Sequence, residues 1–208
     1  MIDLENKTID LDLFKRVLRE IKNSDRTDII DSFSDNQFRS KLQLIDMIDK
    51  CIVLDKDSEI VVFGSWFGSI LIPNLAPKVK KVTCIDLDEQ AIKIAKNRLF
   101  PNYKNIDYIA TDVFEKDRER YWNTKLFINT SCEHMKPMNT WPYWKNILCE
   151  SFFAFQSNNM YHIDTHDNCV ASLQEFKQQM PDNFQVLQEH ELKEDRGTRF
   201  SLVGKISR

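Results

Sequence analysis

The chain has 208 residues, 42% of them hydrophobic, which suits one domain with a sizeable core and a short extension. Its 29 basic and 32 acidic residues give a net charge of -3, which excludes the overall positive field expected of a protein that binds large structured nucleic acid. The five cysteines have no C-x-x-C spacing, which argues against a disulfide framework or a zinc site and favours a reducing compartment.

The first residues are acidic and do not have the pattern of a signal peptide. No apolar run reaches the length needed to span a membrane. We therefore expect a cytoplasmic protein with no membrane partner.

The first 54 residues are predicted to form helices. Apolar residues recur at helical spacing in two stretches, and Ser34 or Asp35 can cap the second. They are Leu11, Phe14, Leu18 and Ile21 in the first stretch, and Phe38, Leu42, Leu44, Ile45, Met47 and Ile48 in the second. Two such helices cannot bury a core alone, so we expect a helical lid over 1–54 and a main domain over 55–208.

In the main domain, strand-like apolar runs alternate with helix-like segments. Strands are expected at 59–63, 81–86, 106–110, 125–130, 151–156, 184–192 and 198–206, and helices at 67–76, 88–99, 141–149 and 170–179. The last two strands face each other across a polar loop. This order predicts an α/β fold with a doubly wound, mostly parallel seven-stranded sheet that ends in an antiparallel hairpin.

A glycine-bearing turn after the first predicted strand is the clearest sign of a ligand site. The turn runs from Gly64 to Gly68, and Asp86 ends the second strand. Glycines let the backbone approach a ligand, and an acid at this strand tip can accept hydrogen bonds from two ribose hydroxyls. The pair predicts a nucleoside site, whereas Trp66 at the middle position disfavours a dinucleotide with its pyrophosphate.

The series of motifs resembles that of the class I S-adenosylmethionine-dependent methyltransferases. It comprises the glycine turn, Asp86, Ala110-Thr111-Asp112-Val113 and Phe127-Ile128-Asn129-Thr130, within residues 55–206. The first motif departs from the family pattern acid-x-Gly-x-Gly-x-Gly, because Val62 replaces the acid and Trp66 the middle glycine. The resemblance implies S-adenosylmethionine as the cofactor, held by Phe63, Gly64, Ser65, Trp66, Gly68, Asp86, Leu87, Asp112, Val113 and Asn129.

Asp86 and Asp112 each have a structural alternative. By resemblance, Asp112 accepts a hydrogen bond from the adenine amine while the backbone N–H of Val113 meets a ring nitrogen. Asp112 can instead be a capping or surface aspartate. Asp86 can cap the helix that begins near Asp88, although Asp88 suits that position better.

The loop 129–135 bears on the type of reaction. The Asn/Asp-Pro-Pro-aromatic stretch of methylases that act on exocyclic amines is absent. Glu133-His134 is similar to the pair at this place in small-molecule O-methyltransferases of the quinone-biosynthesis type. The resemblance implies that His134 accepts the proton of a hydroxyl, with Glu133 as its orienting partner, and the alternative is a packed histidine. An extra glutamate that binds a divalent ion in some of those enzymes is replaced by Thr130, so no metal is expected.

Other polar groups have a functional and a structural interpretation. Cys132 stands where RNA cytosine methylases carry a nucleophile, but a buried inert thiol is the favoured interpretation. The series His162-x-Asp164-x-His166 can hold a metal if it is extended, or be an ordinary polar loop.

Two groups near the expected site can contact an acceptor. The side-chain amides of Asn158 and Asn159 follow the fifth strand and can orient a polar acceptor. Trp141, Tyr143 and Trp144 can pack on the sheet, form an apolar wall for the acceptor, or both.

We therefore predict an S-adenosylmethionine-dependent methyltransferase that acts on a small or medium acceptor, at oxygen. Large structured nucleic acid is disfavoured as a partner because of the net charge. One alternative is transfer of the aminobutyrate arm of the cofactor, as in nicotianamine-synthase-like proteins. Another is a non-catalytic module that binds the cofactor and acts through a partner.

Overall fold

The computed structural model describes residues 2–3, 8–115, 123–147 and 150–207. Two short strands, β1 (Ile2–Asp3) and β2 (Thr8–Ile9), pair antiparallel near the start of the chain. The main sheet has seven strands in the order β5-β4-β3-β6-β7-β9-β8. They are β3 (Glu59–Phe63), β4 (Lys81–Asp86), β5 (Ile106–Ala110), β6 (Thr124–Asn129), β7 (Phe152–Asn158), β8 (Phe184–Glu194) and β9 (Gly197–Ile206).

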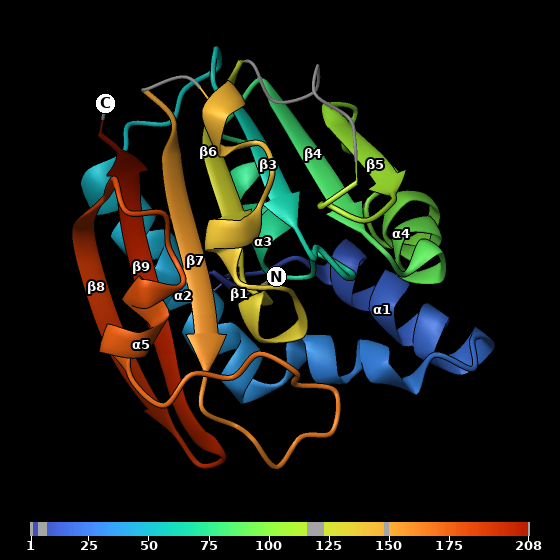
Figure 1. Cartoon of the computed structure of the whole chain (residues 1–208). Helices are drawn as coiled ribbons and strands as arrows, with labels where there is room; N and C mark the ends of the chain where they lie inside the picture. Colours follow the sequence, from blue (N-terminus) through green and yellow to red (C-terminus); the bar gives the residue numbers. More distant parts are fainter. Residues whose placement is uncertain (1, 4–7, 116–122, 148–149, 208) are drawn as a thin grey trace.

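Five strands of this sheet run parallel, and β9 and β8 add an antiparallel hairpin beside β7. Figure 1 shows β9 lying between β7 and β8, so the last strand in the chain is not at the edge of the sheet. The strand order reverses at β3, because its neighbours are β4 on one side and β6 on the other. In such sheets a ligand binds beyond the carboxyl ends of the strands at this reversal.

Helices and turns cover both faces of the sheet. The described elements are α1 (Leu11–Asn23), α2 (Asp35–Cys51), α3 (Leu71–Leu75), α4 (Glu89–Ile94) and α5 (Leu173–Gln178), a π-helical turn at Ala95–Leu99, and 3₁₀ turns at Thr27–Ile29, Asp31–Phe33, Cys132–His134, Met138–Thr140 and Trp144–Asn146. Side chains alternate between the faces along each strand. On β3, Val62 packs with α1 to α4, whereas Val61 and Phe63 pack with the segment around Trp141 and with α5.

The N-terminal helices share the core of the sheet. Leu13 and Val17 of α1 and Leu44 and Ile48 of α2 belong to one buried cluster with the strands. Of the predicted apolar stripe on α1, Leu11, Phe14 and Leu18 are instead half or more exposed. Helix α1 carries two apolar stripes, and the sequence alone does not tell which of them faces the core. No described helix has the length and apolar character needed to cross a bilayer.

The predicted strand positions are confirmed, with shifts of one or two residues at some ends. The predicted helix at 141–149 is wrong for its described part, where short 3₁₀ turns pack instead. Pro142 contributes to this, because proline disfavours helical backbone in the residue before it and Trp141 is extended. The helix predicted at 67–76 is shorter, since Trp66 to Ile70 form a turn before α3.

Candidate functional site

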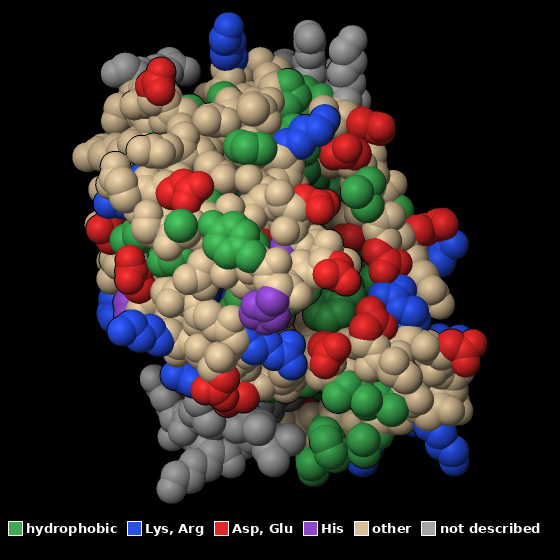
Figure 2. All heavy atoms as spheres, turned by 60° about the horizontal axis from the view of Figure 1, so that its bottom comes forward, with side chains coloured by type: hydrophobic (Ala, Val, Ile, Leu, Met, Phe, Trp, Pro, Cys, Tyr) green, Lys and Arg blue, Asp and Glu red, His purple; other side chains and the backbone are tan. Residues whose placement is uncertain are grey.

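A cavity of about 710 Å³ opens at the carboxyl ends of the central strands. Figure 2, which turns this face forward, shows a hollowed region with acidic side chains around it and histidine and basic side chains beside it. One end of the cavity is lined by Gly64, Trp66, Asp86 and Asp112, and we call it the glycine-turn end. The other end is lined by Glu133, His134, His166 and Arg199, and we call it the histidine end.

The glycine turn has left-handed backbone at three positions, with φ of 55° at Gly64, 46° at Trp66 and 62° at Gly68. At Gly64 a Cβ atom would lie 2.7 Å from Met135 Cε and 2.9 Å from Ser131 Cβ, so only glycine fits there without displacement. Trp66 therefore takes a conformation that favours glycine. The backbone at Trp66 thus has the conformation that a glycine would have at this position, and Trp66 also lines the cavity.

Asp86 holds this turn in place. Its Oδ2 accepts a hydrogen bond from the Trp66 backbone N–H at 2.6 Å, and its Oδ1 accepts one from the Asp88 N–H at 2.8 Å. Burial raises the pKa of Asp86, and these backbone donors oppose the rise. Each carboxylate oxygen keeps a second lone pair, so Asp86 can still accept hydrogen bonds from a ligand in the cavity. Asp88 is the helix cap, accepting from the Ala91 N–H at 2.9 Å.

Asp112 and Val113 follow β5 and line the same end of the cavity. Asp112 Oδ1 accepts a hydrogen bond from the Phe114 backbone N–H at 2.8 Å, which fixes the turn. The Val113 carbonyl accepts a hydrogen bond from the indole N–H of Trp141 at 2.9 Å. The turn after β5 is thus anchored from within and by the buried Trp141 that packs in the same core cluster as Val113.

An ion-pair cluster attaches the N-terminal segment to the glycine-turn end. The Arg26 guanidinium pairs with Asp28 at 2.6 Å and with Asp88 at 2.7 Å. It also lies 5.2 Å from the centre of the Phe67 ring. Hydrogen bonding to Arg26 lowers the pKa of both carboxyl groups. The Trp66 indole N–H donates to Asp28 at 3.3 Å, so the turn and the N-terminal segment share one polar cluster.

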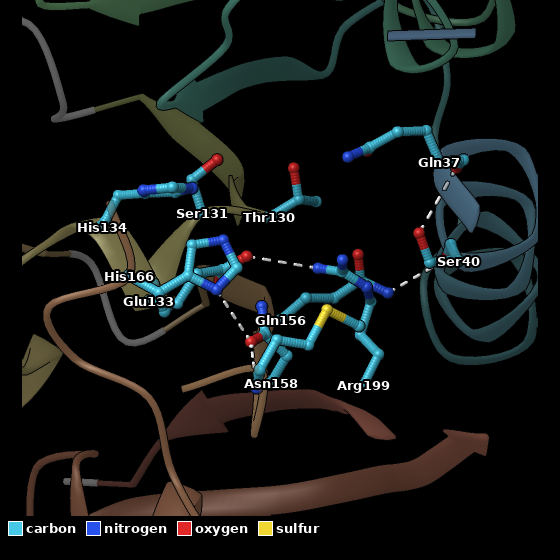
Figure 3. A network of polar contacts seen from close by, with 12 residues as sticks. Gln37, Ser40, Thr130, Ser131, Glu133, His134, Gln156, Asn158, His166 and Arg199 are labelled. Carbon is cyan, nitrogen blue, oxygen red and sulfur yellow. Dashed lines mark hydrogen bonds and ion pairs between the residues drawn. The ribbon is translucent and has the colours of Figure 1, made fainter. Parts of the chain in front are cut away.

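At the histidine end, one ring nitrogen of each histidine makes a hydrogen bond, and Figure 3 shows the bond between His166 and Asn158. His134 Nδ1 lies 2.8 Å from the carbonyl oxygen of Thr165, and His166 Nδ1 lies 3.1 Å from Asn158 Oδ1. The two imidazole rings meet edge to face, with centres 4.6 Å apart. Burial lowers the pKa of His166. The orienting partner of His134 is thus a backbone carbonyl, whereas the sequence predicted Glu133.

Glu133 instead belongs to a buried charged group with Arg199 of β9. The Glu133 Oε1 atom lies 3.3 Å from the guanidinium, and the Glu194 carboxylate lies 3.7 Å from Arg199 Nε. Burial raises the pKa of Glu194, and the charges of Arg199 and Lys41 oppose the rise. Lys41 of α2 is 8% exposed and reaches the Thr130 carbonyl at 3.5 Å. Burial, with the nearby charge of Arg199, lowers the pKa of Lys41 to about 7.

Several predicted site residues lie outside the cavity. Phe63 and Asn129 are buried at strand ends, and the Asn129 amide contacts two methionine sulfurs and the Ser131 N–H. The Cys132 thiol is buried, and burial raises its pKa well above the ordinary value, which fits the inert interpretation. Val62, at the place of the missing acid, is buried in the sheet.

The residues predicted to contact an acceptor have structural roles: the aromatic ones pack on the sheet, and the asparagines make hydrogen bonds within the neighbouring loops. Trp141, Tyr143 and Trp144 pack on the sheet, and none of them lines the cavity, so the packing interpretation holds. Asn158 supports His166, and Asn159 accepts a hydrogen bond from the Thr198 N–H at 2.7 Å.

The series His162-x-Asp164-x-His166 is not extended and lies in a turn. His162 and Asp164 point into solvent while His166 joins the cavity. These three residues therefore do not form a metal site together, and the interpretation as a polar loop fits His162 and Asp164.

Sequence reasoning missed Lys41, Arg199 and the cluster around Arg26. A signal existed for Lys41, which shares the buried face of its helix with Leu44, Ile45 and Ile48. Another existed for Arg199, a charged residue directly before the apolar residues Phe200, Leu202 and Val203 of β9. Buried charges at such positions are uncommon unless they are paired.

No protein-family model matches the sequence. Several solved structures with similar folds are methyltransferases. The N-methyltransferase NodS from Bradyrhizobium japonicum WM9, in complex with S-adenosyl-L-homocysteine, aligns with a TM-score of 0.70 at 14% identity, over 95% of this chain and 100% of that chain. An S-adenosylmethionine-dependent methyltransferase from Leishmania major gives a TM-score of 0.69 at 10% identity, over 93% and 82%.

A ribosomal RNA methylase from Streptococcus thermophilus is also similar, with a TM-score of 0.57 at 18% identity, over 80% of this chain and 97% of that chain. At these identities the likeness concerns the fold. The chain therefore has the class I methyltransferase fold, as the motif series predicted.

Proposed function

We propose that this protein is an S-adenosylmethionine-dependent methyltransferase that methylates a hydroxyl oxygen of a small or medium acceptor. The proposal rests on one observation, that the glycine turn, Asp86, Asp112 and His134 all line the same cavity. Its volume of about 710 Å³ is in the range of sites for a cofactor and a small partner. The neighbour NodS was solved with S-adenosyl-L-homocysteine, which supports the same cofactor for this fold.

The glycine-turn end is the proposed cofactor subsite. There the Asp86 carboxylate accepts hydrogen bonds from the ribose hydroxyls, and Asp112 accepts one from the adenine amine. The sulfonium methyl is electrophilic by itself, so the protein has to align the acceptor and allow its proton to leave. Trp66 in place of a glycine is compatible with a cofactor that has no phosphate.

The histidine end is the proposed acceptor subsite. His134 holds its Nδ1 on the Thr165 carbonyl, which leaves Nε2 with a lone pair. We assign this nitrogen to accept the proton of the acceptor hydroxyl as the methyl group moves from sulfur to oxygen. The fold neighbours include an N-methyltransferase and an RNA methylase, so the fold itself does not select the acceptor atom. Oxygen is favoured by Glu133-His134 in place of an amine-binding motif, and a small acceptor by the net charge of -3.

Isothermal titration of S-adenosyl-L-homocysteine tests the cofactor subsite. We expect Asp86→Ala to weaken binding by about tenfold or more, which is about 1.4 kcal/mol, because it removes charged hydrogen-bond acceptors. Asp88→Ala is the matched control. It removes a helix cap and one of the two carboxylates that pair with Arg26, both outside the cavity, and should lower stability by about 1–2 kcal/mol while affinity stays within about threefold. Absence of binding by the folded wild type would refute the proposal.

A further inference from the structure

Three side chains of metal-ligand type meet at the histidine end. One atom each of Glu133, His134 and His166 lies within 4.8 Å of the other two. Glu133 and His134 come from the loop after β6, and His166 comes from the loop after β7. Within the part of the chain that the structure describes, no other group of three such side chains lies this close.

The Glu133 carboxylate is only half satisfied. Its Oε1 faces Arg199 at 3.3 Å, whereas its Oε2 is buried and has no hydrogen-bond partner. Glu133 is 3% exposed and lines the cavity. A buried carboxylate oxygen without a partner is costly, so a cation that binds Oε2 would stabilise Glu133.

The hydrogen bonds of both histidines leave the same nitrogen free. A carbonyl oxygen can only accept, so His134 Nδ1 carries the proton that it donates to Thr165. Asn158 Oδ1 accepts from the Met160 backbone N–H at 2.9 Å, which identifies this atom as the amide oxygen. His166 Nδ1 must therefore donate to it as well. In both rings Nε2 then carries the lone pair that a metal needs, and Nδ1 is fixed by an outer partner as is usual for ligating histidines.

We propose that Glu133, His134 and His166 bind one divalent transition-metal ion, such as Mn²⁺ or Zn²⁺, at the histidine end of the cavity. Two imidazoles and one carboxylate favour such ions over Mg²⁺ and Ca²⁺, which prefer oxygen ligands. Metal–ligand bonds of about 2.1 Å require ligand atoms roughly 3–4 Å apart. Side-chain rotations that move the ligand atoms by about 1 Å would bring the three residues to these distances. Three protein ligands leave positions open toward the cavity, where an acceptor oxygen can bind.

This inference rests on the proposed function and changes its last step. An ion bound beside the acceptor lowers the pKa of a hydroxyl that coordinates it, so the proton leaves to water before the methyl group arrives. His134 then holds the ion through Nε2 and is not the proton acceptor. The acceptor class is a hydroxyl compound able to coordinate a metal ion.

Titration of MnCl₂ into the metal-free full chain, without cofactor, tests the site by calorimetry and by electron paramagnetic resonance. We expect one Mn²⁺ per wild-type chain, and Mg²⁺ binding at least tenfold weaker. His166→Ala and Glu133→Gln should each weaken Mn²⁺ binding by roughly tenfold or more. His162→Ala is the matched control, because it lies in the same loop, is exposed and is not in the cluster. Its affinity should stay within about twofold.

Circular dichroism verifies the fold of each variant. If Glu133→Gln unfolds because Arg199 loses its partner, His166→Ala still decides the question. Failure of the folded wild type to bind Mn²⁺ or Zn²⁺ would overturn the inference, as would equal binding by His166→Ala. S-adenosyl-L-homocysteine is titrated into the same samples. Cofactor binding without metal binding overturns the ion site alone, and metal binding without cofactor binding supports the ion site and refutes the proposed function.

Discussion

At the glycine-turn end, Asp86 and Asp112 are held by backbone N–H groups that are 2 to 20 residues away in the chain. At the histidine end, Glu133 pairs with Arg199, which is 66 residues away and on another strand. The first end is built from local turns after neighbouring strands. The second is built from side chains that only the complete sheet brings together, and it buries charge. The second should therefore lose more stability than the first when a distant partner residue is changed.

The largest expected effect comes from Arg199→Met. This change leaves the Glu133 and Glu194 carboxylates buried without their cation. Loss of one partner from a buried ionic group costs about 3 kcal/mol or more, so the free energy of unfolding in urea should fall by that amount. Adding Glu194→Gln should restore part of the loss, because one uncompensated charge is removed. A loss below about 1 kcal/mol would mean that the group is better hydrated than its burial indicates.

The next effect concerns the glycine turn. Gly64→Ala places a Cβ atom at 2.7 Å from Met135 Cε, on backbone with φ of 55°. We expect a loss of about 1–3 kcal/mol in stability and weaker binding of S-adenosyl-L-homocysteine. Ser131 and Met135 flank Glu133 and His134, so manganese binding in the folded variant should also weaken, but less than binding of S-adenosyl-L-homocysteine. A parallel loss of both ligands would contradict the separation of the two ends.

Local features of the fold were predictable from the sequence, whereas features set by tertiary packing were not. The strands were predictable because they are apolar or alternating runs bounded by turn residues, and the mostly parallel sheet followed from their alternation with helices. The buried face of α1 was not, because Leu13 and Val17 compete with a second apolar stripe through Leu11, Phe14 and Leu18. Tertiary packing chose between the two.

The candidate site divides in the same way. Gly64 and Asp86 were predictable, because the turn and the strand tip are local features of the sequence. The group of Glu133, His166 and Arg199 was not, because its members lie in three separate segments and no local rule relates them. His166 was named for a metal trio with Asp164 that the turn after β7 does not allow.

Lys41→Met is expected to stabilise the protein near neutral pH. The folded-state pKa of Lys41 is about 7, while a lysine in an unfolded chain has an ordinary pKa of about 10.4. Between these values the unfolded state binds more protons, so the free energy of unfolding of the wild type rises with pH from 7 to 10. Lys41→Met lacks this rise and should be more stable by about 1 kcal/mol or more at pH 7, with the difference shrinking toward pH 10.

The groups that face Lys41 set the size of this effect. Arg199 of β9 lowers its pKa further, while Glu133 and Glu194 raise it. Urea denaturation of both proteins at pH 7, 8.5 and 10 gives the comparison. Parallel stability curves over this range would mean that Lys41 keeps its charge in the folded protein.

The smallest effect should come from Arg26→Ala. The Arg26 side chain is 17% exposed and pairs with two carboxylates, so we expect a loss of about 1 kcal/mol and faster hydrogen exchange in the glycine turn. Arg39→Ala is the matched control, since its pair with Asp35 is 3.8 Å long and both side chains are more than half exposed. It should change stability by less than about 0.3 kcal/mol. Equal effects of the two variants would contradict an anchoring role for Arg26.

The position of β9 between β7 and β8 has a consequence for biosynthesis. A ribosome that adds roughly 5–20 residues per second makes Glu133 several seconds before Arg199, which follows it by 66 residues. During this interval the nascent chain can form the glycine turn and the strands around it, while Glu133 lacks its partner cation. The histidine end is therefore completed only when β9 inserts beside β7, after the segment that forms the glycine turn has been made.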